Sequence, residues 1–318
     1  MPRKSAVVVA VVLAWFSFIA SAQQGGRPIA RDLIGTWILL GVDRPAATPP
    51  AVANPRGLLV FDGAGHALEI TTRAGRTPYA GGQPTPTEAL TTFTSYGGFW
   101  GQYRVDPQQR RISFRNEGAL HPNRMGPDQP EEVRTYELQD NRLVVTSTQA
   151  QPSAPAGTRW TWERVPVLEG LSPAHRRLVG FWQHVMEQRV TVSDKVLSEN
   201  RRAPSVIVYT PSGYVGVHFP PLNRARFAGD QPTEQEALTA IRGYVTYFGS
   251  YTLYPGAVFH HQLAVLGPGQ GNTLRRYFEI SGDQIRLRFP PAQVQGQGEE
   301  ARTIVTLKRL SGEADMTP

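Results

Sequence analysis

The chain of 318 residues contains no cysteine. This absence excludes disulfide bonds, catalysis by a thiolate and a lipid-modified cysteine at the N-terminus. It also excludes every zinc site that is built on cysteine. We therefore expect the fold to be held together by its hydrophobic cores alone.

Runs of charge of one sign are absent as well. The formal net charge is +7 at pH 7, but no run of five or six like charges occurs. Residues 23–165 carry 15 arginines against 13 acidic residues, and residues 166–318 carry 16 lysines and arginines against 13. An excess spread so evenly argues against nucleic-acid binding, in spite of the high isoelectric point.

Long hydrophobic runs are scarce, with one exception at the N-terminus. An apolar segment at residues 6–19 follows Arg3 and Lys4, and residues 20–22 read Ala-Ser-Ala. This pattern is typical of a secretory signal peptide that is cleaved after Ala22. A membrane-spanning helix is the alternative, but the apolar run is too short to span a bilayer comfortably. We therefore expect a periplasmic or secreted protein whose mature chain has no membrane anchor.

Common catalytic motifs are missing from the sequence. It contains no H-E-x-x-H zinc motif, no G-x-S-x-G nucleophile elbow and no phosphate-loop lysine. Residues 267–271 read GPGQG, but no helix is expected to begin after them. Carboxylate pairs suited to glycoside hydrolysis are lacking too, and we expect few acidic side chains inside the fold. The sequence predicts no metal site and no bound cofactor.

What the sequence does contain is an internal repeat. Residues 80–91 read AGGQPTPTEALT and residues 228–239 read AGDQPTEQEALT. Three shorter motifs recur in the same order: LIGTW and LVGFW, RTYEL and RYFEI, and TWERV and TLKRL. The period of 142 to 148 residues is far longer than a solenoid or propeller unit, so each copy is predicted to be a domain.

Each copy consists of short β-prone segments with one helical interruption. Hairpins are predicted where residues 58–61 meet 66–72 and where residues 206–209 meet 214–219. Thr85 with Glu88, and Thr233 with Glu236, have the spacing of helix capping boxes. Seven or eight short strands with little helix indicate a closed barrel or a sandwich.

The motif order resembles that of lipocalins. A Gly-x-Trp motif opens each copy and an arginine lies near its end: Gly35, Trp37 and Arg164, then Gly180, Trp182 and Arg309. The second copy also contains YTPSGY at residues 209–214 and a histidine pair at residues 260–261. In this combination the chain resembles the bacterial and fungal lipocalin-like domain family.

This resemblance implies an all-β fold of two tandem lipocalin-like antiparallel barrels, each with one short helix. We expect barrel 1 at residues 31–165, a linker at 166–173 and barrel 2 at 174–310. A barrel of about eight strands can hold one small ligand in its mouth. The family has no uniform activity, so the resemblance implies a fold and not a function.

The tryptophans of the two Gly-x-Trp motifs could stack on a ligand. In lipocalins, however, this tryptophan closes the barrel base beneath an arginine of the last strand, a contact that is worth about 0.5–2 kcal/mol. We therefore interpret Trp37 with Arg164, and Trp182 with Arg309, as structural pairs.

The histidine pair offers the best functional candidates. Successive residues of a strand face opposite sides, so one of His260 and His261 faces the interior. His261 shares its face with Phe259, Leu263 and Val265, the more apolar set, and is predicted to be the inward one. There it could act as a general acid or base near neutral pH. The alternative is a histidine that only hydrogen-bonds a neighbouring strand.

Other polar residues are candidates for the same cavity. His218 and Tyr214 share a strand face and could meet His261. Tyr103 and Tyr251, in the two G-x-Y motifs, are more typical of wall packing than of proton donation.

Arg134 and Arg276 are candidates for binding an anion. If they face inward, each could hold a carboxylate or an enolate. If they face outward, each would be solvated or paired with the neighbouring Glu137 or Glu279.

Three functions remain open. The favoured hypothesis is binding of a small apolar ligand in the barrel cavity. The first alternative is an enzyme of the cyclase, isomerase or dehydratase type that uses a cavity histidine of barrel 2. Barrel 1 could not use the same histidine, because its residues 114–115 read Phe-Arg where barrel 2 has His-His. The second is a structural or interaction protein with filled barrels. The sequence leaves the ligand and the oligomeric state open.

Overall fold

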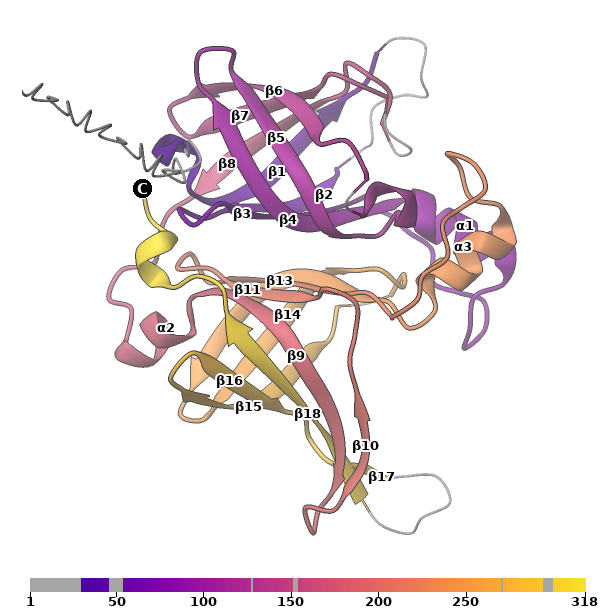
Figure 1. The fold of residues 1–318 in the computed structure, drawn as a ribbon, viewed down its shortest axis with the longest axis vertical. Helices are drawn as coiled ribbons and strands as arrows, with labels where there is room; N and C mark the ends of the chain where they lie inside the picture. Colours follow the sequence, from indigo (N-terminus) through magenta and orange to yellow (C-terminus); the bar gives the residue numbers. More distant parts are fainter. Residues whose placement is uncertain (1–29, 46–53, 127, 151–153, 270, 294–299) are drawn as a thin grey trace, which may run out of the picture.

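The computed structural model describes residues 30–45, 54–126, 128–150, 154–269, 271–293 and 300–318; the predicted signal peptide lies outside these ranges. Within them the chain folds into two antiparallel β-barrels that pack against each other (Figure 1). Each barrel is closed by eight strands, so the predicted fold class is confirmed.

Barrel 1 is a simple up-and-down barrel in which each strand pairs with the next and the last pairs with the first. Its strands are β1 (Gly35–Asp43), β2 (Arg56–Phe61), β3 (His66–Thr72), β4 (Tyr96–Asp106), β5 (Arg111–Ala119), β6 (Glu132–Gln139), β7 (Arg142–Ser147) and β8 (Arg159–Val165). The helix α1 (Pro86–Thr94) lies between β3 and β4, and short 3-10 turns lie at Arg31–Leu33 and Pro122–Arg124.

Barrel 2 repeats this order after the short helix α2 (Pro173–Leu178). Its strands are β9 (Gly180–Thr191), β11 (Val206–Tyr209), β12 (Tyr214–Phe219), β13 (Val245–Tyr254), β14 (Ala257–Val265), β15 (Thr273–Ser281), β16 (Gln284–Arg288) and β18 (Glu300–Arg309). Two further strands, β10 (Val196–Asn200) and β17 (Ala292–Gln293), pair with the ends of β9 and β18 that project beyond the barrel. The helix α3 (Glu234–Ile241) corresponds to α1, and a 3-10 turn at Glu313–Asp315 ends the fold.

The best-matched repeat segment has a structural role at both helices. The side chain of Thr85 accepts a hydrogen bond from the Glu88 amide at 3.3 Å, and the Glu88 carboxylate accepts one from the Thr85 amide at 2.8 Å. The same carboxylate also accepts from the amide of Ala80 at 2.8 Å. Thr233 and Glu236 repeat this capping box. The repeat therefore fixes the loop before each helix.

Each barrel also carries a β-bulge at the same place. The register shifts between Trp100 and Gly101 in β4 and between Phe248 and Gly249 in β13. A Cβ atom on Gly101 would lie 2.1 Å from the nearest backbone oxygen, and one on Gly249 would lie 1.9 Å from the His261 oxygen. Only glycine fits so close an approach. The strand opposite each glycine contains one extra, unpaired residue, and beyond this residue the side chains that face inward and outward are exchanged.

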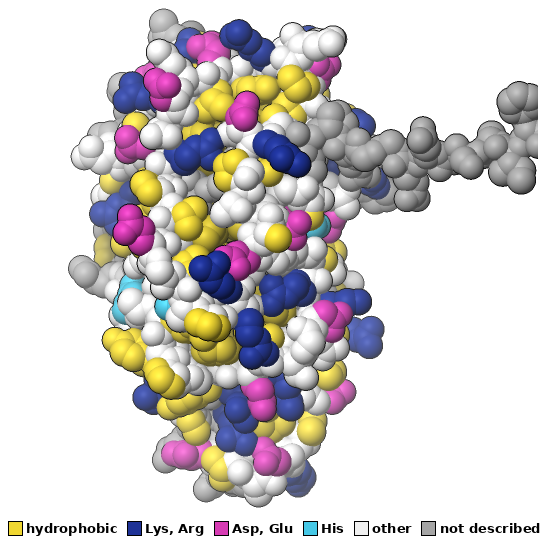
Figure 2. All heavy atoms as spheres, turned by 90° about the vertical axis from the view of Figure 1, so that its left-hand side faces the viewer, with side chains coloured by type: hydrophobic (Ala, Val, Ile, Leu, Met, Phe, Trp, Pro, Cys, Tyr) yellow, Lys and Arg dark blue, Asp and Glu magenta, His cyan; other side chains and the backbone are white. Residues whose placement is uncertain are grey.

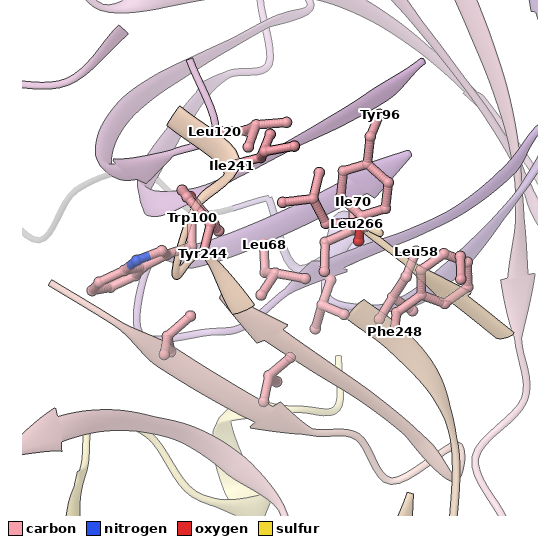
Figure 3. Packing of buried hydrophobic residues seen from close by; sticks show 14 of the residues in the cluster. Leu58, Leu68, Ile70, Tyr96, Trp100, Leu120, Ile241, Tyr244, Phe248 and Leu266 are labelled. Carbon is pink, nitrogen blue, oxygen red and sulfur yellow. The ribbon is translucent and has the colours of Figure 1, made fainter. Parts of the chain in front are cut away.

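A large apolar cluster lies between the two barrels (Figure 3). It combines outward-facing residues of β2, β3 and β4 with those of β9, β11 and β13, and the helices α1 and α3 close one end (Figure 1). Its members include Leu58, Leu68, Ile70, Trp100, Phe181, Val208 and Phe248. The barrels are therefore joined by a buried core.

One pair of polar contacts across this interface is reciprocal. Arg76 of barrel 1 donates to the carbonyl oxygen of Val265 at 2.7 Å, and Arg224 of barrel 2 donates to that of Ala119 at 2.6 Å. These residues occupy matching places in the repeat. Reciprocal contacts are the mark of a two-fold interface, so the barrels pack like the halves of a symmetric dimer.

The outer surface carries charges of both signs. Figure 2 shows basic and acidic side chains interspersed over one face that spans both barrels. This mixture agrees with the even distribution of charge along the sequence.

Candidate functional site

The interior of barrel 1 is filled around a buried arginine. Arg134 of β6 faces inward and is 1% exposed. Its Nη1 donates to Glu69 Oε2 at 2.6 Å, and its Nε donates to Glu132 Oε1 at 2.6 Å. Its guanidinium lies 4.8 to 5.4 Å from the ring centroids of Phe99, Phe114 and Trp160.

The charges of this cluster stabilise one another. Burial alone would lower the pKa of Arg134, but the carboxylates of Glu132 and Glu69 outweigh it and raise the pKa. Burial likewise opposes ionisation of Glu132, yet Arg124 and Arg134 lower its pKa to about 2. The expectation of few inward-facing acidic side chains is thus wrong for barrel 1. Two glutamates inside this barrel neutralise Arg134, which the sequence indicates as a candidate for binding an anion.

Barrel 2 instead contains a partly open cavity of about 220 Å³. Its walls are inward-facing side chains of several strands and include Ile207, Val217, Tyr247, His260, Gln262, Leu274, Arg276, Leu287, Phe289 and Val305. The space at the mouth of barrel 1 measures only about 60 Å³. A larger hollow of about 450 Å³ beside that mouth is lined by loops and strand ends, not by inward strand faces. The cavity of barrel 2 is therefore the candidate site.

A buried histidine lies in the wall of this cavity between two tyrosines. His260 is 1% exposed. Its Nε2 lies 2.9 Å from the hydroxyl of Tyr209, and its Nδ1 lies 2.7 Å from the hydroxyl of Tyr247. Both ring nitrogens of His260 are therefore engaged.

The environment keeps His260 neutral. Burial lowers the pKa of His260 to about 3, helped by the positive charge of Arg276. A neutral imidazole donates one hydrogen bond and accepts one, so one tyrosine donates to the ring and the other accepts from it. If Nδ1 carries the proton, Tyr247 accepts and its own hydroxyl proton remains free to bond a ligand. Tyr247 is the tyrosine of this pair that lines the cavity.

Arg276 of β15 supplies the positive charge of the cavity. Its guanidinium lies 3.7 Å from the ring centroid of Phe289, and its Nη1 donates to the carbonyl of Arg275 at 2.8 Å. Burial lowers the pKa of Arg276, and the nearby phenols of Tyr247 and Tyr209 partly offset this effect. The guanidinium is thus held in place beside the histidine.

The alternative pairing of the two arginines is wrong. Glu279 lies 3.5 Å from Arg288, and Glu137 lies 3.9 Å from Arg159, in exposed pairs on the outer faces. Neither glutamate forms an ion pair with Arg276 or Arg134, because side chains three residues apart on a strand face opposite sides of the sheet.

The wall of the barrel 2 cavity also contains an ion pair. Arg202 Nε lies 3.0 Å from Glu187 Oε2, and both side chains are mostly buried. The two charges cancel, so Arg276 dominates the charge of a cavity whose histidine is neutral.

The prediction that His261 faces the interior is wrong. His261 lies on the outer face, where its ring nitrogens lie 2.9 Å from the Thr252 hydroxyl and 3.1 Å from that of Thr273. The bulge after Gln262 explains the error: Val265 faces inward only because the bulge reverses the alternation, so it does not share a face with His261. Leu263, the extra residue, is 44% exposed.

His218 and Tyr214 do not reach the cavity either. They lie on the face of β12 that packs against barrel 1, where Tyr214 borders the apolar cluster of the interface. The ring nitrogens of His218 lie 3.1 Å from the hydroxyl of Tyr244. Complete burial lowers the pKa of His218 to about 3. These residues hold the barrels together and cannot meet His261.

Tyr103 and Tyr251 occupy matching places in the barrel walls. The hydroxyl of Tyr103 donates to the carbonyl of Asp62 at 2.7 Å, and that of Tyr251 donates to the carbonyl of Thr210 at 3.0 Å. Burial raises the pKa of both phenols. Both hydroxyls tie the wall to the nearby hairpin, and neither residue lines the cavity.

The two tryptophan–arginine pairs lie at the barrel ends. The guanidinium of Arg164 lies 4.2 Å from the ring centroid of Trp37, and that of Arg309 lies 4.0 Å from that of Trp182. Each indole is fully buried and donates to a backbone carbonyl four residues earlier. Each arginine also donates to the backbone carbonyl that immediately precedes the first strand: Arg164 to that of Ile34 at 2.6 Å and Arg309 to that of Val179 at 3.0 Å.

Sequence reasoning missed Tyr209, Tyr247 and the inward role of His260. The signal that could have corrected it is Gly249, because an isolated glycine within a strand pattern indicates a bulge. With the bulge placed opposite Gly249, the alternation puts His260 inward.

The described ranges lack two kinds of feature. Among the residues that the structure describes, no three His, Asp or Glu side chains gather closely enough to hold a metal ion. In the same ranges no helix combines the length and the apolar composition that crossing a membrane requires.

Two solved structures align with most of the chain at low sequence identity. No curated protein matches the chain. A solved structure of a protein of unknown function from Nostoc punctiforme PCC 73102, of the DUF3598 family, is 11% identical, covers 88% of this chain and 97% of its own, and has a TM-score of 0.21. A candidate outer membrane protein from Bacteroides fragilis NCTC 9343 is 10% identical, covers 88% and 98%, and has a TM-score of 0.22.

The family comparison is more direct. The model of the lipocalin-like domain matches residues 34–165 and again residues 179–310, which together make up most of the chain. These two matches coincide with the two barrels. The chain therefore belongs to the lipocalin-like domain family, with two tandem copies.

Proposed function

We propose that the protein binds a small, largely apolar molecule in the cavity of barrel 2. The observation that carries this proposal is the asymmetry of two barrels with the same topology. Barrel 1 fills its interior with side chains, whereas barrel 2 leaves about 220 Å³ lined mainly by apolar groups and a few convergent polar ones. Such a lining is typical of small-molecule sites, and the volume suits a ligand below drug size, since pockets for drug-sized ligands measure roughly 300–1,000 Å³.

The exchange of one large residue for a small one contributes to the opening. Trp160 of β8 lies opposite Val145, and Val305 of β18 lies opposite Leu287, so Trp160 and Val305 hold equivalent positions. In barrel 1 the indole occupies the interior beside Arg134. Val305, at the equivalent position, is smaller and lines the cavity of barrel 2.

Binding fits the histidine better than catalysis does. A general acid or base works best when its pKa is near the working pH. The pKa of His260 is lowered to about 3, and both ring nitrogens already have tyrosine partners. This arrangement supports a fixed polar wall for a ligand more than a proton-transfer group.

We further propose that the protein is exported, on the basis of the N-terminal pattern. Charged residues, an apolar segment and Ala-Ser-Ala follow one another there as in a signal peptide. Expression of the full chain, cell fractionation and N-terminal sequencing test this proposal. A mature chain that begins at Gln23 outside the cytoplasm supports it, and an uncleaved cytoplasmic chain contradicts it.

Extraction of the purified protein followed by mass spectrometry tests the binding function. The variant Val305→Trp restores the residue of barrel 1 and should fill the cavity. Val196→Trp is a matched control, because Val196 is 47% exposed on β10, beyond the barrel. We expect one small molecule to co-purify with the unmodified protein and the control but not with Val305→Trp. Absence of any bound molecule, or equal retention by Val305→Trp, would contradict the proposal.

A further inference from the structure

The filled barrel indicates what the open barrel lacks. Arg134 lies opposite Ile112 in the β5–β6 pair, and Arg276 lies opposite Val258 in the β14–β15 pair. The two arginines therefore hold equivalent positions, and both face the interior of their barrel. What surrounds them differs in charge.

In barrel 1 the arginine is neutralised by two glutamates. Glu69 lies opposite Phe99, and its counterpart in barrel 2, opposite Tyr247, is Val217. Glu132 is likewise replaced. Phe114 and His260 hold equivalent positions in the two barrels. Glu132 lies opposite Phe114 and Leu274 lies opposite His260, so Leu274 takes the place of Glu132. Both carboxylates that pair with Arg134 are thus absent around Arg276.

Within the part of the chain that the structure describes, this leaves a mostly buried guanidinium without a carboxylate partner. Among the described residues, no Asp or Glu forms an ion pair with Arg276, and Glu187, the acid in the cavity wall, is paired with Arg202. An arginine side chain stays charged in a protein, and burying a charge is costly unless an opposite charge accompanies it. The place of the two missing carboxylates is part of the cavity itself, since Val217 and Leu274 line it.

We infer that the ligand of barrel 2 is a small carboxylic acid, whose carboxylate binds Arg276 where the glutamates of barrel 1 bind Arg134. This inference rests on the proposed binding function and specifies its ligand class. The apolar body of the acid packs against Val217, Leu274, Leu287 and Val305. The hydroxyl of Tyr247 can donate to the carboxylate when it accepts a hydrogen bond from His260.

The arrangement is already set for such a ligand. Phe289 supports the guanidinium at 3.7 Å, and the carbonyl of Arg275 fixes one of its nitrogens. A donor that is held in position loses little freedom when the ligand binds, which favours affinity. Arginine also matches the two oxygens of a carboxylate with two parallel N–H groups.

The test compares acids with their uncharged amides. Isothermal titration calorimetry on the mature full-length protein uses straight-chain acids of four to ten carbons and 4-phenylbutyric acid, each beside its amide. We expect at least one acid to bind about tenfold or more tightly than its amide, the difference that a charge-assisted hydrogen bond gives. The variant Arg276→Met should abolish this preference.

Two further variants keep the test specific. Arg275→Met changes the neighbouring arginine, which faces outward, and should keep the preference for the acid. Val217→Glu places a carboxylate where Glu69 lies in barrel 1, and should weaken binding of the acid about tenfold or more while the melting temperature is maintained. This second variant remains informative if Arg276→Met does not fold.

The outcomes separate this inference from the function on which it rests. Equal affinity of acids and amides for the unmodified protein, or a preference that survives in Arg276→Met or Val217→Glu, overturns the carboxylate site and leaves an apolar cavity. Failure of the whole series, acids and amides alike, overturns the binding function as well.

Discussion

Phe114 and His260 hold the same position in the two barrels. Phe114 lies opposite Tyr103 in barrel 1, and His260 lies opposite Tyr251 in barrel 2. A buried phenyl ring needs no hydrogen-bond partner, whereas a buried imidazole needs one for each nitrogen. The partners in barrel 2 are two tyrosines at positions where barrel 1 has phenylalanine: Tyr209 for Phe61 and Tyr247 for Phe99. The three polar residues therefore form one unit.

This unit predicts a non-additive effect on stability. His260→Phe leaves two buried hydroxyls without their partner, so we expect it to lower the free energy of unfolding by about 1–3 kcal/mol. The triple variant Tyr209→Phe, His260→Phe and Tyr247→Phe copies barrel 1 and removes the unsatisfied groups together. It should recover most of the loss, as urea denaturation can measure. A triple variant less stable than the single one would show that the three residues act independently.

Acid should destabilise the protein at a pH above the range where carboxylates titrate. Burial lowers the pKa of His260 and of His218 from 6.5 to about 3. Below pH 6.5 these two histidines bind protons in the unfolded chain but not in the folded one. Their contribution to the free energy of unfolding is therefore fully present above pH 6.5 and decreases as the pH falls toward 3. Each histidine contributes a slope of up to about 1.4 kcal/mol per pH unit.

Urea denaturation between pH 7.5 and 4.5 checks this slope. The window is informative because the ion pairs of Glu132, whose pKa is lowered to about 2, weaken only at lower pH. The triple phenylalanine variant lacks His260 and should show a slope smaller by about one proton. An unchanged slope would mean that His260 does not remain neutral in the folded protein.

Local signals in the sequence predicted the elements well. The capping boxes at Thr85 and Thr233 need only a threonine and a glutamate three residues apart, and the structure contains both. The hairpins and the two barrels also follow from short-range patterns and from the repeat. Such features depend on neighbours along the chain, which a sequence displays directly.

The site depended on information that is not local. The bulge opposite Gly249 breaks the alternation of the strand. Strict alternation without the bulge therefore predicted His261, and not His260, as the inward histidine. His218 lies on an apolar outer face that is buried only because a second barrel covers it. Glu69 stands between Leu68 and Ile70, so its apolar surroundings did not show that an arginine of a distant strand would pair with it. Strand register and domain packing decided all three.

The tryptophan of each Gly-x-Trp motif is predicted to act in stability alone. Trp182→Ala should lower the free energy of unfolding by about 3–5 kcal/mol, because it removes a fully buried indole and its stacked arginine. Trp37→Ala should have an effect of similar size in barrel 1. Urea denaturation of both variants provides the measurement. A loss below about 1 kcal/mol would contradict the structural role of these residues.

The interface predicts that the two halves of the chain associate without a covalent link. Residues 23–168 and 169–318 each expose part of the apolar cluster when separated, and exposed patches of this kind drive association. Hydrogen bonds across the interface add specificity: Trp100 donates to the carbonyl of Pro204 at 3.1 Å, and the amide of Gly63 donates to that of Asp315 at 2.6 Å.

Co-expression of the two halves followed by size-exclusion chromatography tests this prediction. We expect them to elute together at the mass of the full chain. Leu68→Asp places a charge in the fully buried interface and should separate or aggregate the halves, whereas Tyr254→Asp, at a site that is 58% exposed, should leave them associated. Unmodified halves that elute separately would show that the covalent connection, and not the shared core, holds the barrels together.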